Sequence, residues 1–175
     1  MALAVCLLFD SRSERLVRDL WARLEDLGVG TLASHTHRRH HPHLSYAVLR
    51  SWDLDEVRDA LSSLPDGGEL EVSCHGALVF PRGRVALAPA VGAGIAARQE
   101  QVVAAVEATT GADLHRNYRA ARWVPHVSVA TRASATQIPW AVKAIADVVP
   151  LPLRATRAAL VDSATGRLVP LPHVP

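Results

Sequence analysis

Apolar and polar positions alternate in several stretches of the chain, and two of these stretches have nearly the same sequence. Residues 42–47 read Pro-His-Leu-Ser-Tyr-Ala, and residues 125–130 read Pro-His-Val-Ser-Val-Ala. Successive side chains of an extended strand point to opposite faces. Each stretch therefore predicts a strand that carries one histidine and one serine on the same face, backed by an apolar face that can pack into a core.

Further alternating or continuous apolar runs predict the other strands. They cover the start of the chain up to residue 10, residues 70–80, a strand beginning near residue 85, residues 153–161 and residues 167–171. Turn sequences at 81–83 and 164–166 predict that the last four of these form two hairpins. His75-Gly76 interrupts the alternation of residues 70–80, which predicts a bulge there.

Apolar residues at helical spacing predict four helices between these strands. They begin near residues 11, 53, 92 and 134, and three of the starts carry a pair of residues with capping-box spacing. The pairs are Ser11 with Glu14, Asp53 with Glu56, and Ser134 with Gln137.

Both halves of the chain repeat one order of elements: a helix, a polar or basic loop, a Pro-His-apolar-Ser strand and a capped helix. This order indicates an internal duplication. We therefore predict an α+β fold of two lobes related by a pseudo-twofold axis, each an antiparallel sheet with outer helices. One motif strand from each lobe meets its counterpart in a central groove, and residues 1–175 form a single domain.

Composition narrows the class of protein. The net charge of +2 is too small to indicate nucleic-acid binding by itself, and the basic residues are almost all arginine, for which a GC-rich genome is the simpler explanation. Cys6 and Cys74 lie in apolar runs without paired spacing, so we expect reduced thiols and a cytoplasmic protein. The apolar start is short and lacks a basic leader, so we expect no signal peptide and no membrane contact.

Two histidines and two hydroxyls in one groove suit phosphoryl chemistry without a metal or cofactor. Histidine titrates near pH 6.5, so one imidazole can remove a proton from the attacking oxygen while the other protonates the leaving oxygen. The hydroxyls of Ser45 and Ser128 can donate hydrogen bonds to the nonbridging oxygens. A phosphodiester with a sugar hydroxyl as leaving group, above all a 2′,3′-cyclic phosphate, is the substrate that this arrangement fits.

The paired motif resembles the 2H phosphoesterases, which carry two copies of His-x-Thr/Ser-x, and in particular their 2′-5′ RNA ligase-like and 2′,3′-cyclic phosphodiesterase branch. Residues 76–81 (Gly-Ala-Leu-Val-Phe-Pro) and 84–87 (Arg-Val-Ala-Leu) are similar to the hairpin between the family's motifs. The resemblance implies a bilobal fold and metal-independent opening of cyclic phosphates. It implies that His43 and His126 are the acid and the base, in an order left open, and that Ser45 and Ser128 bind phosphate.

Other residues are candidates for substrate binding. After the second motif, strand parity places Arg132 on the same face as His126 if the strand extends that far. Tyr118 and Trp123 could stack on a base, although packing against the second lobe is the simpler role, and His41 could contact phosphate. The segment with His35, His37, His40 and His41 invites a zinc hypothesis, but no Cys, Asp or Glu accompanies it, and a solvated loop is favoured.

We therefore predict a monomeric phosphodiesterase that acts on an RNA end or small nucleotide with a cyclic phosphate, and whose reverse reaction would join RNA ends through a 2′-5′ link. Two alternatives remain. One is a non-catalytic protein that binds RNA ends or nucleotides, and the other is a metal-dependent hydrolase that uses the His-rich loop.

Overall fold

The apolar alternation forms the strands that the sequence predicts, in a computed structural model that describes residues 2–175. The strands are β1 (Leu3–Phe9), β2 (His43–Ser51), β3 (Leu70–Phe80), β4 (Arg84–Ala90), β5 (Asp113–Leu114), β6 (Val127–Ala130), β7 (Leu151–Asp162) and β8 (Leu168–Pro170). The helices are α1 (Ser11–Asp26), α2 (Leu54–Ser62), α3 (Ala93–Glu107) and α4 (Ile138–Ala146), with a 3-10 turn, η1, at Arg116–Tyr118. The predicted α+β class is confirmed.

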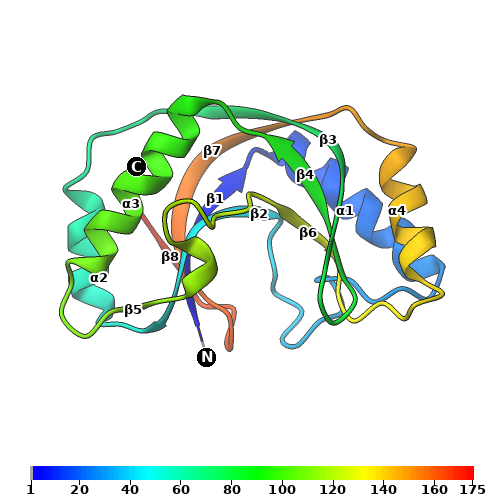
Figure 1. The fold of residues 1–175 in the computed structure, drawn as a ribbon, viewed down its shortest axis with the longest axis horizontal. Helices are drawn as coiled ribbons and strands as arrows, with labels where there is room; N and C mark the ends of the chain where they lie inside the picture. Colours follow the sequence, from blue (N-terminus) through cyan, green and yellow to red (C-terminus); the bar gives the residue numbers. More distant parts are fainter. Residues whose placement is uncertain (1) are drawn as a thin grey trace.

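The strands form one antiparallel sheet in the order β5-β2-β1-β7-β3-β4-β6, which bends into an arch (Figure 1). Strand β7 joins its two halves, because its residues 155–162 pair with β1 and its residues 151–155 pair with β3. Strand β8 also pairs with β7. The two sheets predicted from the sequence are thus continuous with each other through β7.

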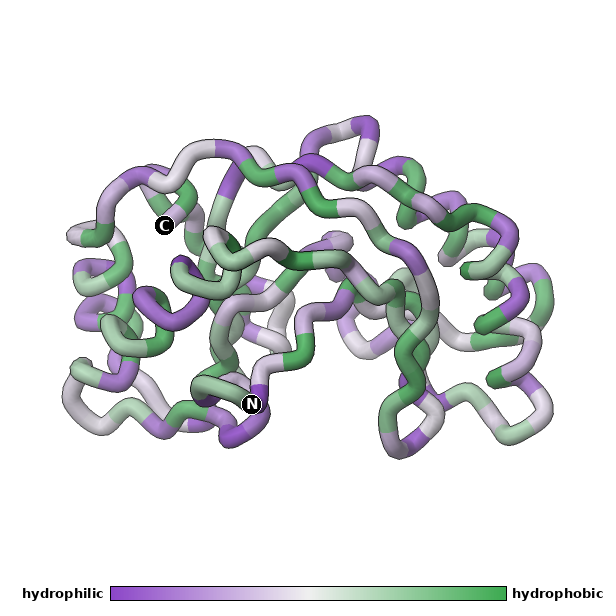
Figure 2. Tube along the Cα trace, turned by 45° about the horizontal axis from the view of Figure 1, so that its top comes forward, coloured by the Kyte–Doolittle hydropathy of each residue, from purple (hydrophilic) through white to green (hydrophobic). Residues whose placement is uncertain are grey.

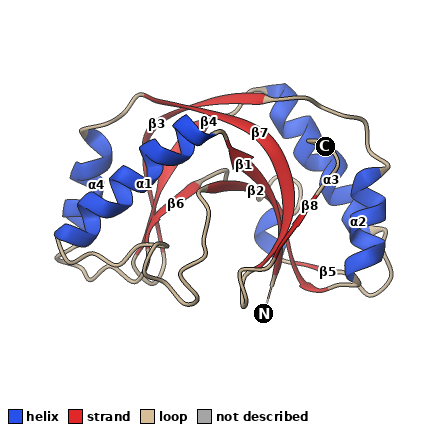
Figure 3. Cartoon of the chain, turned by 180° about the vertical axis from the view of Figure 1, so that it is seen from behind, coloured by secondary structure: helices blue, strands red, loops and turns tan. Residues whose placement is uncertain are grey.

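The helices gather at the two ends of the arch, which makes the molecule bilobal (Figure 3). Helices α2 and α3 pack together beside β2 and β5, and helices α1 and α4 pack together beside β3, β4 and β6. Apolar segments follow the strands and one side of each helix, while the connecting loops are more polar (Figure 2). Helix α1 belongs to the first half of the chain but packs in the lobe that holds the second motif, so the two halves support each other.

The predicted helix caps agree with the structure at some helix starts, but the cap predicted for α1 does not. Asp53 caps α2 by accepting the backbone N–H groups of Asp55 and Glu56. At α1, however, the cap is Asp10, whose carboxylate accepts the N–H of Ser13 at 2.7 Å. Ser11 is already helical, so the prediction that Ser11 caps this helix was wrong.

Two further local predictions are confirmed. The register of β3 against β4 shifts between Cys74 and Gly76, which is the predicted bulge. Ser134 and Gln137 exchange hydrogen bonds just before α4. Both cysteines are buried and free, and none of the helices within residues 2–175 is long and apolar enough to cross a membrane.

Candidate active site

The two motif strands come together between the lobes, where their backbones approach without hydrogen bonding to each other. Strand β6 is at the edge of the sheet, and β2 pairs with β5 only beyond its motif, at Leu49 and Ser51. His126 lies close enough to His43 for the charge of His43 to lower the pKa of His126. The structure therefore brings the two motif strands, and with them the two motif histidines, close to each other.

Both motif histidines have the same backbone anchor. The Nδ1 atom of His43 bonds to the carbonyl of His41 at 2.7 Å, and Nδ1 of His126 bonds to the carbonyl of Val124 at 2.8 Å. A carbonyl oxygen only accepts hydrogen bonds, so Nδ1 carries the proton in both rings. This leaves Nε2 as the ring atom that is available to exchange a proton.

The motif serines are also held by a repeated contact. The indole N–H of Trp123 donates to the carbonyl of Ser45 at 3.0 Å, and that of Trp21 donates to the carbonyl of Ser128 at 3.1 Å. Each tryptophan comes from the half of the chain that does not contain the serine it supports. The ring of Trp123 also lies 6.2 Å from that of Tyr46, so this tryptophan packs against the first motif strand and not, as the sequence favoured, against the second lobe.

The first motif has a sulfur neighbour. Cys6 of β1 is paired with Ser45 across the sheet, and its Sγ lies 3.7 Å from the serine Oγ. Burial lowers the pKa of His43, but the Cys6 sulfur and the His41 carbonyl raise it more, so the result is about 9. His43 is therefore protonated at neutral pH.

The second motif has cationic and aromatic neighbours instead. The ring of Phe80 lies 4.9 Å from that of His126. Burial lowers the pKa of His126, the carbonyl of Val124 opposes this, and the charges of His43 and Arg84 lower it further. The net result is a pKa below 6.5, so His126 is neutral at neutral pH.

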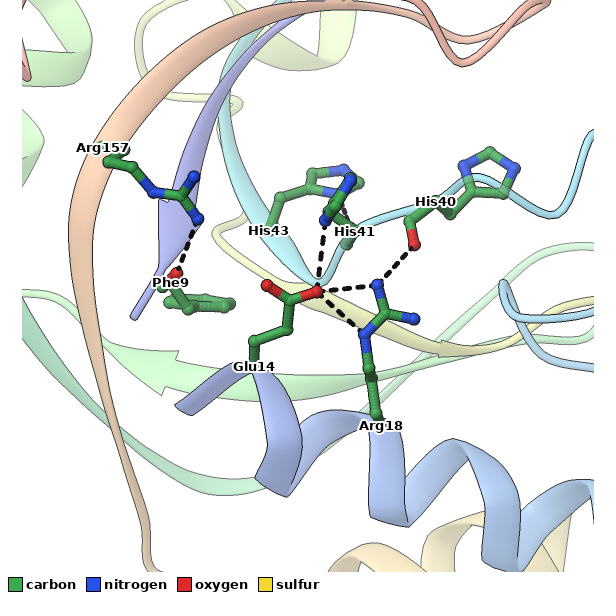
Figure 4. Close-up of polar contacts among 7 residues, drawn as sticks. All are labelled: Phe9, Glu14, Arg18, His40, His41, His43 and Arg157. Carbon is green, nitrogen blue, oxygen red and sulfur yellow. Dashed lines mark hydrogen bonds and ion pairs between the residues drawn. The ribbon is translucent and has the colours of Figure 1, made fainter. Parts of the chain in front are cut away.

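A carboxylate anchors the segment before His43 (Figure 4). Glu14, in the first turn of α1, contacts Nδ1 of His41 at 3.2 Å and the guanidinium of Arg18 at 2.7 Å. Arg18 also donates to the carbonyl of His40 at 3.3 Å. These bonds fix the backbone whose carbonyl orients His43, and they show that the His41 imidazole contacts Glu14.

Tyr118 lies in the same groove, on the 3-10 turn. Burial raises the pKa of its hydroxyl to about 12, the Cys6 sulfur adds to this, and Ser45 and Arg84 oppose it. The buried Gln99 amide donates to the carbonyls of Tyr46 and Tyr118, at 3.1 and 2.8 Å. Gln99 thereby ties the turn that carries Tyr118 to the first motif strand.

The condition for the strand-parity argument on Arg132, that the strand extends that far, is not met. Strand β6 ends at Ala130, and Arg132 has the left-handed backbone angle φ 54°, so the alternation of the strand does not extend to it. Arg132 instead lines a cavity together with His35, Arg82, Arg84 and Thr131.

The His-rich loop forms contacts within itself. The His37 and His40 rings lie 4.1 Å apart, and His40 Nε2 bonds to the hydroxyl of Thr36 at 2.9 Å. Burial, together with the charges of neighbouring histidines, lowers the pKa of His40 to about 4. In residues 2–175, three or more His, Cys, Asp or Glu side chains are nowhere grouped so that they could hold a metal ion.

Sequence reasoning missed two residues of the groove, Cys6 and Arg84. Cys6 lies on a strand that is apolar on both faces, so alternation does not reveal which face a residue takes. Arg84 was noted only as part of a hairpin, and its approach to His126 depends on how that hairpin packs against β6.

Comparisons with known proteins agree with this fold. Residues 13–167 match the family model of the 2′-5′ RNA ligase superfamily. The structure of Kluyveromyces marxianus Usb1 with uridine monophosphate is similar, with a TM-score of 0.56 and 15% sequence identity over 98% of this chain and 97% of that chain. The MHV ns2 PDE domain is similar with a TM-score of 0.51 and 16% identity over 97% and 96% of the two chains. The curated proteins include no match to this chain.

Both of these structures show the fold, and the family model covers most of the sequence. The two His-x-Ser strands and the hairpin between them lie within the matched residues. The chain therefore belongs to the 2′-5′ RNA ligase superfamily.

Proposed function

We propose that this protein is a phosphodiesterase that hydrolyses 2′,3′-cyclic phosphates of RNA ends or small nucleotides by two-histidine acid–base catalysis. One observation carries the proposal. Two imidazoles with the same Nδ1 anchor lie close enough for the charge of one to affect the other, and their pKa values are shifted in opposite directions. Titratable groups whose surroundings separate their pKa values are typical of an acid–base pair.

The opposite directions of the two pKa shifts support one assignment of the roles that the sequence leaves open. His126 is neutral and accepts a proton from the attacking water, whose oxygen forms a new bond to phosphorus. His43 is protonated and donates its proton to the 2′ or 3′ oxygen as the bond from phosphorus to that oxygen breaks. Ser45 and Ser128 donate hydrogen bonds to the nonbridging oxygens. The product is a phosphomonoester beside a free hydroxyl, and no step passes through a metal.

The similar proteins support a nucleotide substrate. One of them was solved with uridine monophosphate and the other is described as a PDE domain. The reverse reaction, in which a 5′-hydroxyl replaces water and a 2′-5′ link forms, uses the same two proton transfers. We also propose that residues 1–175 act as one domain and as a monomer, and that the protein is cytoplasmic, which the two free, buried cysteines support.

An assay on 2′,3′-cyclic nucleotides and on oligonucleotides that end in a cyclic phosphate tests the function. Treated with excess chelator, the protein is expected to retain full turnover, and separation of 2′- from 3′-phosphate products identifies the leaving oxygen. Loss of turnover on chelation, restored by added metal, would favour the metal-dependent alternative.

The non-catalytic alternative is tested with His126→Ala. The variant is expected to keep binding a product nucleotide while turnover falls by a factor of about 10² to 10⁴. His75→Ala is the matched control, because His75 is exposed on β3. Equal, slow turnover by the wild type and His126→Ala would favour a binding protein.

A further inference from the structure

A basic cavity lies beside the proposed site and has no part in the two proton transfers. Its volume is about 160 Å³, and its lining residues come from three segments of the chain. They are His35, Arg82, Arg84, Thr131 and Arg132. A water molecule occupies about 30 Å³ in the liquid, so the cavity has room for a phosphate group.

The cavity carries positive charge that the protein leaves uncompensated. Within residues 2–175, no ion pair or side-chain hydrogen bond involves the guanidinium groups of Arg82, Arg84 and Arg132. Burial lowers the pKa of His35, and the charges of Arg132 and Arg84 lower it further. Three unpaired guanidinium groups that converge on one cavity form a site for an anion, and phosphate fits their planar donors.

The backbone holds two of these arginines in place. Arg82 and Arg132 have left-handed φ angles of 66° and 54°, which non-glycine residues rarely adopt. The Ala133 N–H donates to the carbonyl of Gly83 at 2.8 Å, and a Cβ atom on Gly83 would lie 2.0 Å from the Ala133 oxygen. The β3–β4 turn is therefore locked against the segment after β6. Backbone strain retained in this way is common at ligand sites.

The cavity adjoins the reacting groups through the β3–β4 hairpin. Arg84 is paired with Phe80 across that hairpin, and Phe80 stacks near His126. Arg84 is also close enough to lower the pKa of His126. An anion in the cavity would thus lie on the His126 side of the reacting phosphorus.

We propose that this cavity binds the phosphodiester that joins the terminal nucleotide to the rest of its strand. The preferred substrate is then an oligonucleotide end instead of a mononucleotide. This inference rests on the proposed function, because it takes the reacting phosphate to lie between His43 and His126.

Two dinucleotides that end in a 2′,3′-cyclic phosphate test the proposal. One has an ordinary internal phosphodiester and the other an uncharged methylphosphonate link. In the wild type, kcat/KM is expected to be about tenfold higher or more for the charged link, which corresponds to about 1.4 kcal/mol. The ratio should fall as salt concentration rises. A ratio of one in the wild type would overturn the proposal.

Variants of the cavity arginines test whether the preference for the charged link arises from the cavity. Arg82→Gly and Arg132→Gly remove a guanidinium and keep a residue that tolerates the left-handed backbone. Each is expected to bring the charged-to-neutral ratio toward one, with Arg82→Gln as a second replacement in case the glycine variant fails to fold. Arg15→Ala, an exposed arginine of α1 outside the cavity, should leave the ratio as in the wild type. An equal loss for both substrates in the Arg82 and Arg132 variants would overturn the proposal.

Binding separates failure of this proposal from failure of the function. If the wild type turns over neither dinucleotide, the proposed hydrolysis is wrong. The affinities of the protein for the matching 3′-phosphate dinucleotides then test whether the cavity binds phosphate. Tighter binding of the charged link, lost in Arg82→Gly, would support the phosphate site. Equal affinities would reject it.

Discussion

The two motif strands have the same internal geometry but different surroundings. In each, the histidine Nδ1 bonds to the carbonyl two residues earlier, and a tryptophan indole bonds to the serine carbonyl. The surroundings differ: the Cys6 sulfur raises the pKa of His43, whereas burial, together with the charges of His43 and Arg84, lowers that of His126. A duplicated motif can therefore supply two matched imidazoles, while residues from other strands give them opposite protonation states.

Replacement of the serines tests whether the two copies are equivalent in binding the phosphate, and we expect the largest effect here. Ser45→Ala and Ser128→Ala should each lower kcat by a factor of about 10² to 10³, because each removes a donor to the charged oxygens. Steady-state kinetics on a cyclic-phosphate substrate measure this. Ser62→Ala, on α2, is the control. A loss in only one of the two variants would show that the copies differ in chemistry as well as in charge.

Replacement of the two tryptophans tests whether the indole bonds stabilise the two motif strands equally. Trp21→Phe and Trp123→Phe leave a serine carbonyl without its donor, which costs about 1–3 kcal/mol of the free energy of unfolding where the carbonyl is buried. The change should be similar in the two variants, as measured by denaturant unfolding. The replacement Trp140→Phe affects a half-exposed indole on α4 and should be nearly neutral. A much larger loss of stability for one tryptophan would show that the two indole bonds do not support the two motif strands equally.

The pH dependence of activity tests the difference between the copies. Since His126 must be neutral and His43 protonated, kcat/KM should rise through a pKa below 6.5 and fall through one near 9. Cys6→Ala removes a group that raises the pKa of His43, so the alkaline limb should move to lower pH while the acidic limb stays. Above the lowered pKa, kcat/KM should fall about tenfold for each further increase of one in pH. An unchanged alkaline limb in Cys6→Ala would mean that Cys6 does not set the charge of His43.

The anchor of the first motif gives the smallest expected effect. Glu14→Gln weakens the contacts to His41 and Arg18, which are partly exposed and contribute at most about 1 kcal/mol. We therefore expect kcat to fall by a factor of about 5 or less, with KM nearly unchanged. Asp55→Asn, in a similar ion pair with Arg58 on α2, is the matched control. A change in KM alone would indicate that Glu14 affects substrate binding and not the orientation of His43.

Local patterns along the chain predicted most of the fold, because they depend on neighbours in the sequence. The alternation of His43, Ser45 and Ala47, the Asp53 cap and the bulge at Gly76 all have this origin. The position of α1 depends on long-range packing, and no local pattern shows that Trp21 supports the serine of the other copy.

In the candidate site too, some residues follow from local sequence patterns and others depend on long-range packing. The motif identifies four side chains by spacing alone, and the structure brings their strands together. The contacts of Cys6 and Arg84 arise from strand pairing between distant segments, so the chain order does not reveal them. No residue pattern marks the end of β6 at Ala130, which is why strand parity does not extend to Arg132.

The indole bonds to the motif strands have a consequence for self-association. A strand edge with free backbone groups is a template for pairing with another chain. Trp123 and Trp21 occupy the carbonyls of Ser45 and Ser128, and β6 lies at the edge of the sheet, where only a single bridge from Thr31 to Ala130 continues the pairing among the described residues. The two side chains that hold the serines thus also occupy strand carbonyls that could otherwise pair with another chain.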